Sequence, residues 1–194
     1  MDLADRRGLE TDVYQPAEDS ELLARAACER LAEGDLVLEV GTGSGYVADR
    51  IARTLGARVV ASDLNPHACR QARERGADAG LEVVRADLVS PFIEDAFDAV
   101  VFNPPYLPTD PENEWDDWME QALSGGETGR EVIEAFLADV PRVLAPDGVV
   151  LLLVSSLTGV DQVVERAGEA GFSAVAVADE SFPYETLTVL ELVR

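Results

Sequence analysis

The sequence predicts an α/β domain built on a mostly parallel, doubly wound sheet of seven strands with helices on both faces. Short apolar stretches alternate with longer amphipathic ones along the 194 residues, a pattern typical of parallel sheets with crossover helices. Residues 97–102 and 149–154 are nearly all apolar, as central strands of such sheets are. The last apolar stretches, 174–178 and 187–193, are joined by a segment too short for a crossover helix, so they should pair as an antiparallel hairpin.

Capping and turn residues give the order of the elements. Gly34 ends the first expected helix, Asn65 followed by Pro66 begins a later one, and Thr158 with Asp161 forms an expected capping pair. Residues 1–194 are expected to form one domain, with 1–13 flexible. The expected helices cover 16–33, 45–55, a segment starting at 65, 130–144 and 158–170, and the expected strands 36–40, 57–62, 81–85, 97–102, 149–154, 174–178 and 187–193. Residues 107–129 are expected to form a long functional loop, and residues 146–148 a turn.

The composition is strongly acidic. There are 38 Asp and Glu against 15 basic residues, all of them arginine, for a net charge of −23. Such a surface repels itself unless salt screens it, and the absence of lysine favours adaptation to a halophilic, high-salt cytoplasm. Cys28, Cys69 and His67 form no metal-ligand pattern and no disulfide framework. No apolar stretch is long enough for a membrane helix and residues 1–12 hold no signal peptide pattern, so a cytoplasmic protein without a metal is expected.

A glycine-rich loop follows the first strand and indicates a nucleoside-type ligand. Glycines stand at 41, 43 and 45, where they let the backbone turn tightly and approach a ligand. The last position of a dinucleotide fingerprint is Tyr46 instead of glycine, so the loop does not match a pyrophosphate cradle. Asp63, 22 residues after Gly41, can accept both ribose hydroxyls. Asp87 can accept the amine of an adenine. The alternatives are that Asp63 caps the next helix and Asp87 is a turn residue.

Glu39 lies within the apolar first strand, just before the glycines. A buried carboxylate is costly unless it is paired. The amino group or the sulfonium of S-adenosylmethionine would supply the partner charge, and the alternative is hydrogen bonding to loop amides. Together with the terminal hairpin, these residues predict a class I methyltransferase fold, which is Rossmann-like and uses S-adenosyl-L-methionine, giving S-adenosyl-L-homocysteine as product.

The segment Asn103-Pro104-Pro105-Tyr106 follows the central fourth strand. An amide or exocyclic amine is a poor nucleophile because its lone pair is delocalised. The Asn103 side-chain carbonyl and the Pro104 backbone carbonyl can accept the two N–H groups and draw the nitrogen out of conjugation. The prolines stiffen the loop, and Tyr106 offers a face for a planar group. The segment therefore predicts methylation of an amino nitrogen. The alternative is that it is only a proline-rich turn beside a cleft.

Three segments, 13–20 (Val-Tyr-Gln-Pro-Ala-Glu-Asp-Ser), 39–45 and 103–106, resemble the HemK-type protein glutamine methyltransferases. The first is similar to the short archaeal and eukaryotic branch, which methylates the glutamine of the Gly-Gly-Gln loop in class I translation release factors. The bacterial branch carries an extra N-terminal helical domain and fits less well. The family also implies a partner, a small zinc-binding methyltransferase activator subunit that forms a heterodimer with the catalytic chain.

The resemblance also implies site residues. Ser20 stands where eukaryotic members have threonine, and its hydroxyl should serve equally. Residues expected at the cofactor are Tyr14, Pro16, Ser20, Glu39, Gly41, Gly43, Asp63, Leu64, Asp87, Leu88 and Asn103, and those expected at the substrate are Asn103, Pro104, Pro105 and Tyr106.

Two other functions remain open from the residues alone. The Asn-Pro-Pro-Tyr segment also serves adenine-N6 and other nucleic-acid amine methyltransferases, although no arginine cluster or added recognition domain is present. A cofactor-binding scaffold without activity is the non-enzymatic alternative, against which the intact motifs argue.

Overall fold

The computed structural model describes residues 12–109 and 118–194. The expected flexibility of residues 1–13 falls almost wholly on residues outside these ranges, and so does the middle of the expected 107–129 loop. Among the described residues no helix is long and apolar enough to cross a membrane.

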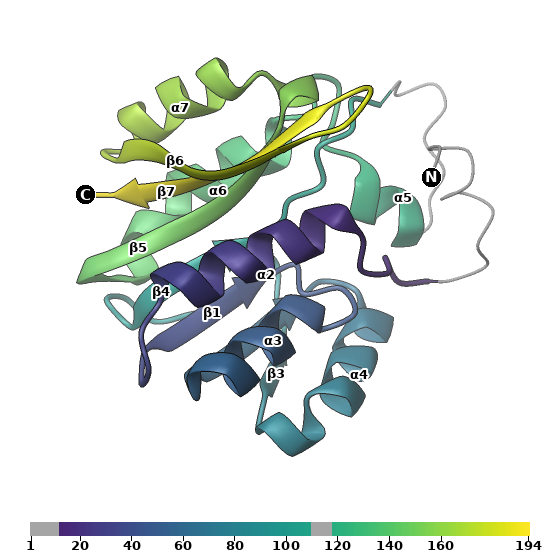
Figure 1. The fold of residues 1–194 in the computed structure, drawn as a ribbon, viewed down its shortest axis with the longest axis vertical. Helices are drawn as coiled ribbons and strands as arrows, with labels where there is room; N and C mark the ends of the chain where they lie inside the picture. The colour runs from purple at the N-terminus through teal and green to yellow at the C-terminus, as the bar shows by residue number, and fades with distance from the viewer. Residues whose placement is uncertain (1–11, 110–117) are drawn as a thin grey trace.

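Within the described residues, seven strands form one sheet in the order β3-β2-β1-β4-β5-β7-β6 (Figure 1). The first five strands pair in parallel, and β7 lies antiparallel between β5 and β6. The predicted sheet and its terminal antiparallel hairpin are therefore confirmed. The strands are β1 (Leu36–Val40), β2 (Arg58–Asp63), β3 (Glu82–Arg85), β4 (Phe97–Phe102), β5 (Leu144–Ser155), β6 (Ser173–Ser181) and β7 (Thr186–Val193).

Helices cover both faces of the sheet (Figure 1). One face carries α2 (Glu18–Arg30) and α3 (Tyr46–Leu55), with α4 (Pro66–Arg75) beside α3, and the other carries α6 (Glu131–Val143) and α7 (Val160–Glu169). Alternate side chains of each central strand enter separate cores, because successive residues of a strand point to opposite faces. In β4, Val101 packs under α2 and α3 while Phe102 packs under α6. The smaller helices are η1 (Ala77–Ala79), α5 (Trp118–Leu123) and η3 (Ser156–Thr158).

Two predicted helix starts are wrong. The first helix begins at Glu18, not at residue 16, because Ala17 has an extended backbone and is the N-cap. It ends at Arg30, before the predicted stop at Gly34. The expected Thr158–Asp161 capping pair does not form. Residues 156–158 make the separate turn η3, in which the Thr158 hydroxyl donates to the Ser155 carbonyl at 2.7 Å. The helix α7 then begins after Gly159 without a side-chain cap.

Two loop predictions are also corrected. Residues 146–148 do not separate helix α6 from the next strand as a turn, because β5 already starts at Leu144 and runs through them. The register against β4 shifts there, since Phe97 pairs with Leu144 and Ala99 with Val149. Residues 145–148 therefore form a bulge-like irregularity within the strand. Residues 118–123 within the expected loop form the short helix α5.

Candidate active site

The site lies where the carboxyl ends of the parallel strands meet. The strand β1 sits between β2 and β4, and the chain crosses over in opposite directions from it, so a crevice opens at this edge. A cavity of about 960 Å³ occupies it. Every residue predicted from the sequence for the cofactor or the substrate lines this one cavity: Tyr14, Pro16, Ser20, Glu39, Gly41, Gly43, Asp63, Leu64, Asp87, Leu88, Asn103, Pro104, Pro105 and Tyr106.

The glycine loop leaves the end of β1 in a conformation that suits glycine. Gly41 has a φ of +62°, and a Cβ atom there would lie 3.2 Å from the Phe102 ring. The next residue is anchored, because the Thr42 N–H donates to the Ser62 carbonyl at 2.9 Å. The loop therefore holds bare backbone at the cavity wall, where a ligand can approach it closely.

Glu39 is buried beneath this loop and is 3% exposed. Its Oε2 accepts a hydrogen bond from the Thr42 hydroxyl and another, at 3.0 Å, from the Ala48 N–H in α3. Burial raises the pKa of Glu39 to about 8, against these two hydrogen bonds, which lower it. The Glu39 carboxyl is thus hydrogen-bonded within the protein, to the glycine loop and to α3, which resembles the alternative of hydrogen bonds to loop amides. It also lines the cavity.

Asp63 ends β2 and holds the glycine loop. Its Oδ2 accepts from the Gly43 N–H and its Oδ1 from the Asn65 N–H, both at 2.8 Å. Burial raises the pKa of Asp63. The alternative that Asp63 caps the next helix is wrong, because the Asn65 side chain accepts from the His67 N–H and caps α4 as the Asn65-Pro66 pattern predicts.

Asp87 and Leu88 follow β3 in a tight turn. The Asp87 carbonyl accepts from the Ser90 N–H at 3.2 Å and from its hydroxyl at 2.8 Å. The Asp87 side chain itself is exposed at the cavity. Leu88 has a φ of +46°, a left-handed conformation that is strained for a leucine. Asp87 is therefore both a turn residue and a lining residue.

Asn103 stands at the end of β4 with an unsatisfied acceptor. Its Oδ1 atom is buried and is the one buried side-chain nitrogen or oxygen in the described residues without a hydrogen-bond partner. Such an atom costs free energy unless a ligand supplies a donor. Pro104 and Tyr106 are buried beside it, so the Asn-Pro-Pro-Tyr segment is fixed by the core instead of being a free surface turn.

The segment before α2 also reaches the cavity, and it includes a residue that the sequence analysis missed. Tyr14 donates through its hydroxyl to Asp19 Oδ2 at 2.9 Å, while Ser20 donates through its N–H to Asp19 Oδ1 at 2.6 Å. Asp19 is 3% exposed and lines the cavity between these two predicted residues. Its place beside Ser20 in the sequence was the available signal.

A second missed part of the site is the wall formed by α5 and the residue after it. Trp118, Gln121 and Ser124 line the cavity. Leu107 ties this wall to the catalytic segment, because its N–H donates to the Leu123 carbonyl at 3.0 Å and its carbonyl accepts from Gly125 at 2.9 Å. The length of the segment after Tyr106 indicated a functional role but not a helix.

All the charged side chains that line the cavity, within the described residues, are acidic. The lining contains five carboxyl side chains and no arginine or histidine. The acidic lining residues are Asp19, Glu39, Asp63, Asp87 and Glu131. A cavity of this kind suits a ligand that carries positive charge and disfavours phosphate groups. In the described residues, no group of three or more His, Cys, Asp or Glu is placed to hold a metal ion.

A sheet in this strand order, with its last strand inserted antiparallel and a glycine loop at the switch point, defines a class I S-adenosylmethionine-dependent methyltransferase. A family model described as a methyltransferase domain matches residues 37–126. The more particular assignment comes from relatives that span nearly the whole chain.

Methyltransferase HEMK2 of Homo sapiens is 34% identical over 198 residues, covering 97% of this chain and 92% of the human protein. A Methanocaldococcus jannaschii protein assigned as a protein N5-glutamine methyltransferase is 34% identical over 188 residues, covering 96% and 94%. The structure of the E. cuniculi Mtq2–Trm112 complex, responsible for methylation of the termination factor eRF1, superimposes with a TM-score of 0.77 at 32% identity, covering 95% and 99%. The chain therefore belongs to the HEMK2/Mtq2-type family of N5-glutamine methyltransferases.

Proposed function

We propose that this chain methylates the side-chain amide of the glutamine in the Gly-Gly-Gln motif of a class I translation release factor. The observation that carries the proposal is the buried, unpartnered Oδ1 of Asn103 at the cavity. The relatives support the choice of an amide, since the M. jannaschii protein is assigned as a protein N5-glutamine methyltransferase and the Mtq2–Trm112 complex methylates the termination factor eRF1.

The residues of this chain would act by positioning the glutamine amide. Asn103 Oδ1 accepts one N–H of the glutamine amide, and the backbone carbonyl of Pro104 accepts the other, which draws the nitrogen lone pair out of the amide π system. The bound cofactor supplies an electrophilic methyl group. Tyr106 and the proline rings would keep the segment rigid, so that the amide is held in one orientation as the new N–C bond forms. The nitrogen, once methylated, loses one of its two protons to solvent without a general base.

The cofactor fits the acidic lining. S-adenosylmethionine carries a sulfonium and an ammonium group, and the cavity offers carboxyl groups with no competing arginine. Glu39 and Ser20 would bind the methionine part, with Tyr14 and Pro16 over it and Gly41 and Gly43 against it. Asp63 and Leu64 would bind the ribose, and Asp87 and Leu88 the adenine. S-adenosyl-L-homocysteine, the product, lacks the sulfonium charge and should bind the same residues.

The same lining argues against the nucleic-acid alternative. A polynucleotide brings phosphates, which bind through arginine and lysine. The described lining has none of these residues. A neutral glutamine side chain on a protein loop meets no such repulsion.

A partner subunit and a high-salt habitat complete the proposal. The similar Mtq2 is found in a complex with Trm112, so this chain is proposed to form a heterodimer with a small zinc-binding activator of that kind. The absence of lysine and the net charge of −23 support adaptation to molar salt, where the Debye length is about 3 Å and acidic side chains repel each other little.

The test uses the full chain, with and without its activator subunit, in molar salt. It is incubated with methyl-labelled cofactor and a purified archaeal-type release factor. Label on the Gly-Gly-Gln glutamine is the expected result, and a release factor with that glutamine changed to alanine is the control. Label on RNA or DNA with none on the release factor would overturn the proposal in favour of the nucleic-acid alternative.

A further inference from the structure

The backbone and side chain of Asn65 form hydrogen bonds to three parts of the cavity wall. Asn65 is 7% exposed. Its backbone N–H donates to Asp63 Oδ1 and its side-chain Oδ1 accepts from the His67 N–H, both at 2.8 Å. Its side-chain Nδ2 donates to the Asp12 carbonyl at 2.6 Å. The first two bonds belong to β2 and to the cap of α4, whereas the third reaches a segment 53 residues earlier in the chain.

That segment forms a strap, defined here as residues 12–16, which passes over the cavity from α4 to the start of α2. Val13, Tyr14 and Pro16 of the strap line the cavity. The strap is held at its α2 end by the bond from the Tyr14 hydroxyl to Asp19, and at its α4 end by the bond from Asn65.

Two other contacts between the strap and α4 are exposed. His67 lies 3.8 Å from the Asp12 carboxylate, with 41% and 67% of the two side chains exposed. Gln71 donates to the Gln15 side chain at 3.4 Å. Exposed contacts of this kind contribute little because water and salt compete with them. The Asn65 bond is partly buried, and Asn65 itself is 7% exposed, so this bond meets less of that competition.

We propose that Asn65 is a positioning residue that latches the strap over the bound cofactor and thereby slows its release. The two halves of its amide have separate duties, because Oδ1 caps α4 while Nδ2 holds the strap. Loss of the Nδ2 donor would loosen the strap at its α4 end and would leave α4 capped. The inference rests on cofactor binding at this site, as proposed above, and not on the identity of the methylated substrate.

The separate duties allow a clean test with Asn65→Ser in the full chain. Serine is as good an N-cap as asparagine, and its hydroxyl is too short to reach the Asp12 carbonyl. Calorimetry and stopped-flow binding of S-adenosylhomocysteine should show a dissociation constant raised about tenfold through faster dissociation, as for the loss of one partly buried hydrogen bond. The melting temperature without ligand should fall by no more than about 2–4 °C, since one bond is lost and α4 keeps its cap. The control is Gln71→Ala, which removes an exposed strap contact and should leave both values unchanged.

Unchanged dissociation constant and dissociation rate in Asn65→Ser would overturn the latch. If that variant melts lower by more than this, Asn65→Asp carries the test, since it keeps the shape and the cap and lacks only the N–H donor. An Asn65→Asp variant that binds S-adenosylhomocysteine as the unaltered chain does would also overturn it. Failure of the release-factor proposal is separate, because these measurements contain no release factor.

Discussion

At the scale of single residues, Asn103 is the central residue of the catalytic segment, and its buried Oδ1 lacks a hydrogen-bond partner among the described residues. A native protein that keeps such an atom gives up folding free energy at that position. The atom can regain it only when a donor enters the cavity. Glu39 differs in that it has hydrogen-bond donors, but its burial raises its pKa to about 8 and so disfavours the ionised form. Both residues are better suited to the liganded state than to the free one.

The variant Asn103→Ala should lower kcat for methyl transfer by a factor of at least about 10², the effect of losing one preorganised hydrogen-bond partner of a transition state. Because Oδ1 has no partner to lose in the free chain, the free energy of unfolding in urea should not fall. Turnover close to that of the unaltered chain would contradict the proposed mechanism.

Cofactor binding at neutral pH should release a proton from Glu39. With a pKa of about 8 the carboxyl is mostly protonated in the free chain at pH 7. A nearby ammonium group favours the ionised form and lowers that pKa. Calorimetry of S-adenosylhomocysteine binding in two buffers of different ionisation enthalpy should therefore give different apparent enthalpies. In Glu39→Gln the difference should disappear. Equal enthalpies in both buffers for the unaltered chain would refute the release.

Glu39 should also make stability fall as pH rises. Its pKa is raised from 4.5 to about 8 on folding, so between these values the folded chain binds a proton that the unfolded chain has lost. The contribution is fully present below pH 4.5 and is lost as pH rises toward 8. The measurement is the difference in unfolding free energy between the unaltered chain and Glu39→Gln at pH 5 and pH 8. A difference that favours the unaltered chain more at pH 8 would show the wrong sign.

At the scale of elements, the packing of α3 against α4 fixes the glycine loop. Gly45 precedes α3 with a φ of +78°, and a Cβ atom there would lie 2.7 Å from the Ala72 Cα in α4. Gly56, after the same helix, has a φ of +65° and open space around it. The two glycines share a left-handed backbone and differ in the room that they have.

Gly56→Ala should therefore cost about 1 kcal/mol of unfolding free energy, the backbone term alone. Gly45→Ala should cost several times more, since α4 must move to admit the methyl group. It should also weaken S-adenosylhomocysteine binding, because Asp63 and the glycine loop shift with α4. Denaturant unfolding and calorimetry measure the two effects. Equal costs for the two variants would mean that the close packing of α3 against α4 does not add to the cost of Gly45→Ala.

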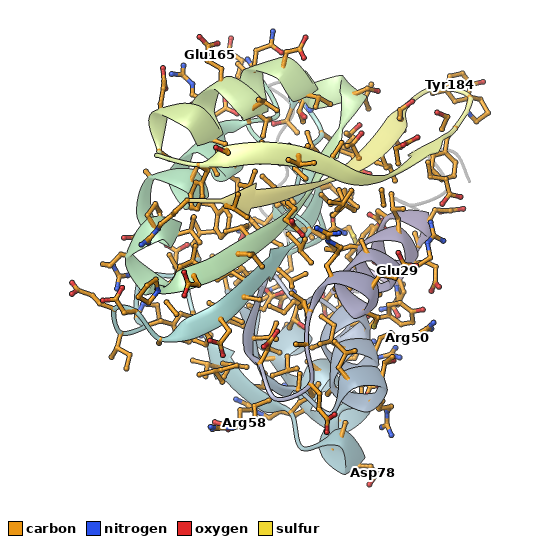
Figure 2. The ribbon with its side chains drawn as sticks, turned by 60° about the vertical axis from the view of Figure 1, so that its left-hand side comes forward. Glu29, Arg50, Arg58, Asp78, Glu165 and Tyr184 are labelled. Carbon is orange, nitrogen blue, oxygen red and sulfur yellow. The ribbon has the colours of Figure 1, made fainter. Side chains whose placement is uncertain are left out.

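At the scale of the whole molecule, the net charge of −23 governs how stability depends on salt. The acidic excess is spread over the surface, where Figure 2 shows Glu29, Asp78 and Glu165 pointing outward from three different helices. The Arg30–Glu191 ion pair at 2.7 Å offsets little of it. Mutual repulsion of this kind destabilises the folded state at low ionic strength.

The melting temperature should consequently rise as KCl is increased from 0.1 M to 2 M. A variant with Glu29→Gln, Asp78→Asn and Glu165→Gln carries three fewer exposed charges and should show a smaller rise, with a higher melting temperature at low salt. The same dependence on salt in both proteins would mean that screening of surface charge is not its cause.

The sequence by itself determined that the chain forms this sheet and the order of its main helices and strands. It also predicted residues that all prove to line one cavity. It could do so because apolar periodicity and capping residues are local signals, and because parallel strands bring their carboxyl ends to one edge. The tertiary structure alone decided the bulge in β5, the helix α5, the burial of Asp19 and the reach of Asn65 to Asp12. These depend on contacts between segments far apart in the chain, which local residue patterns do not encode.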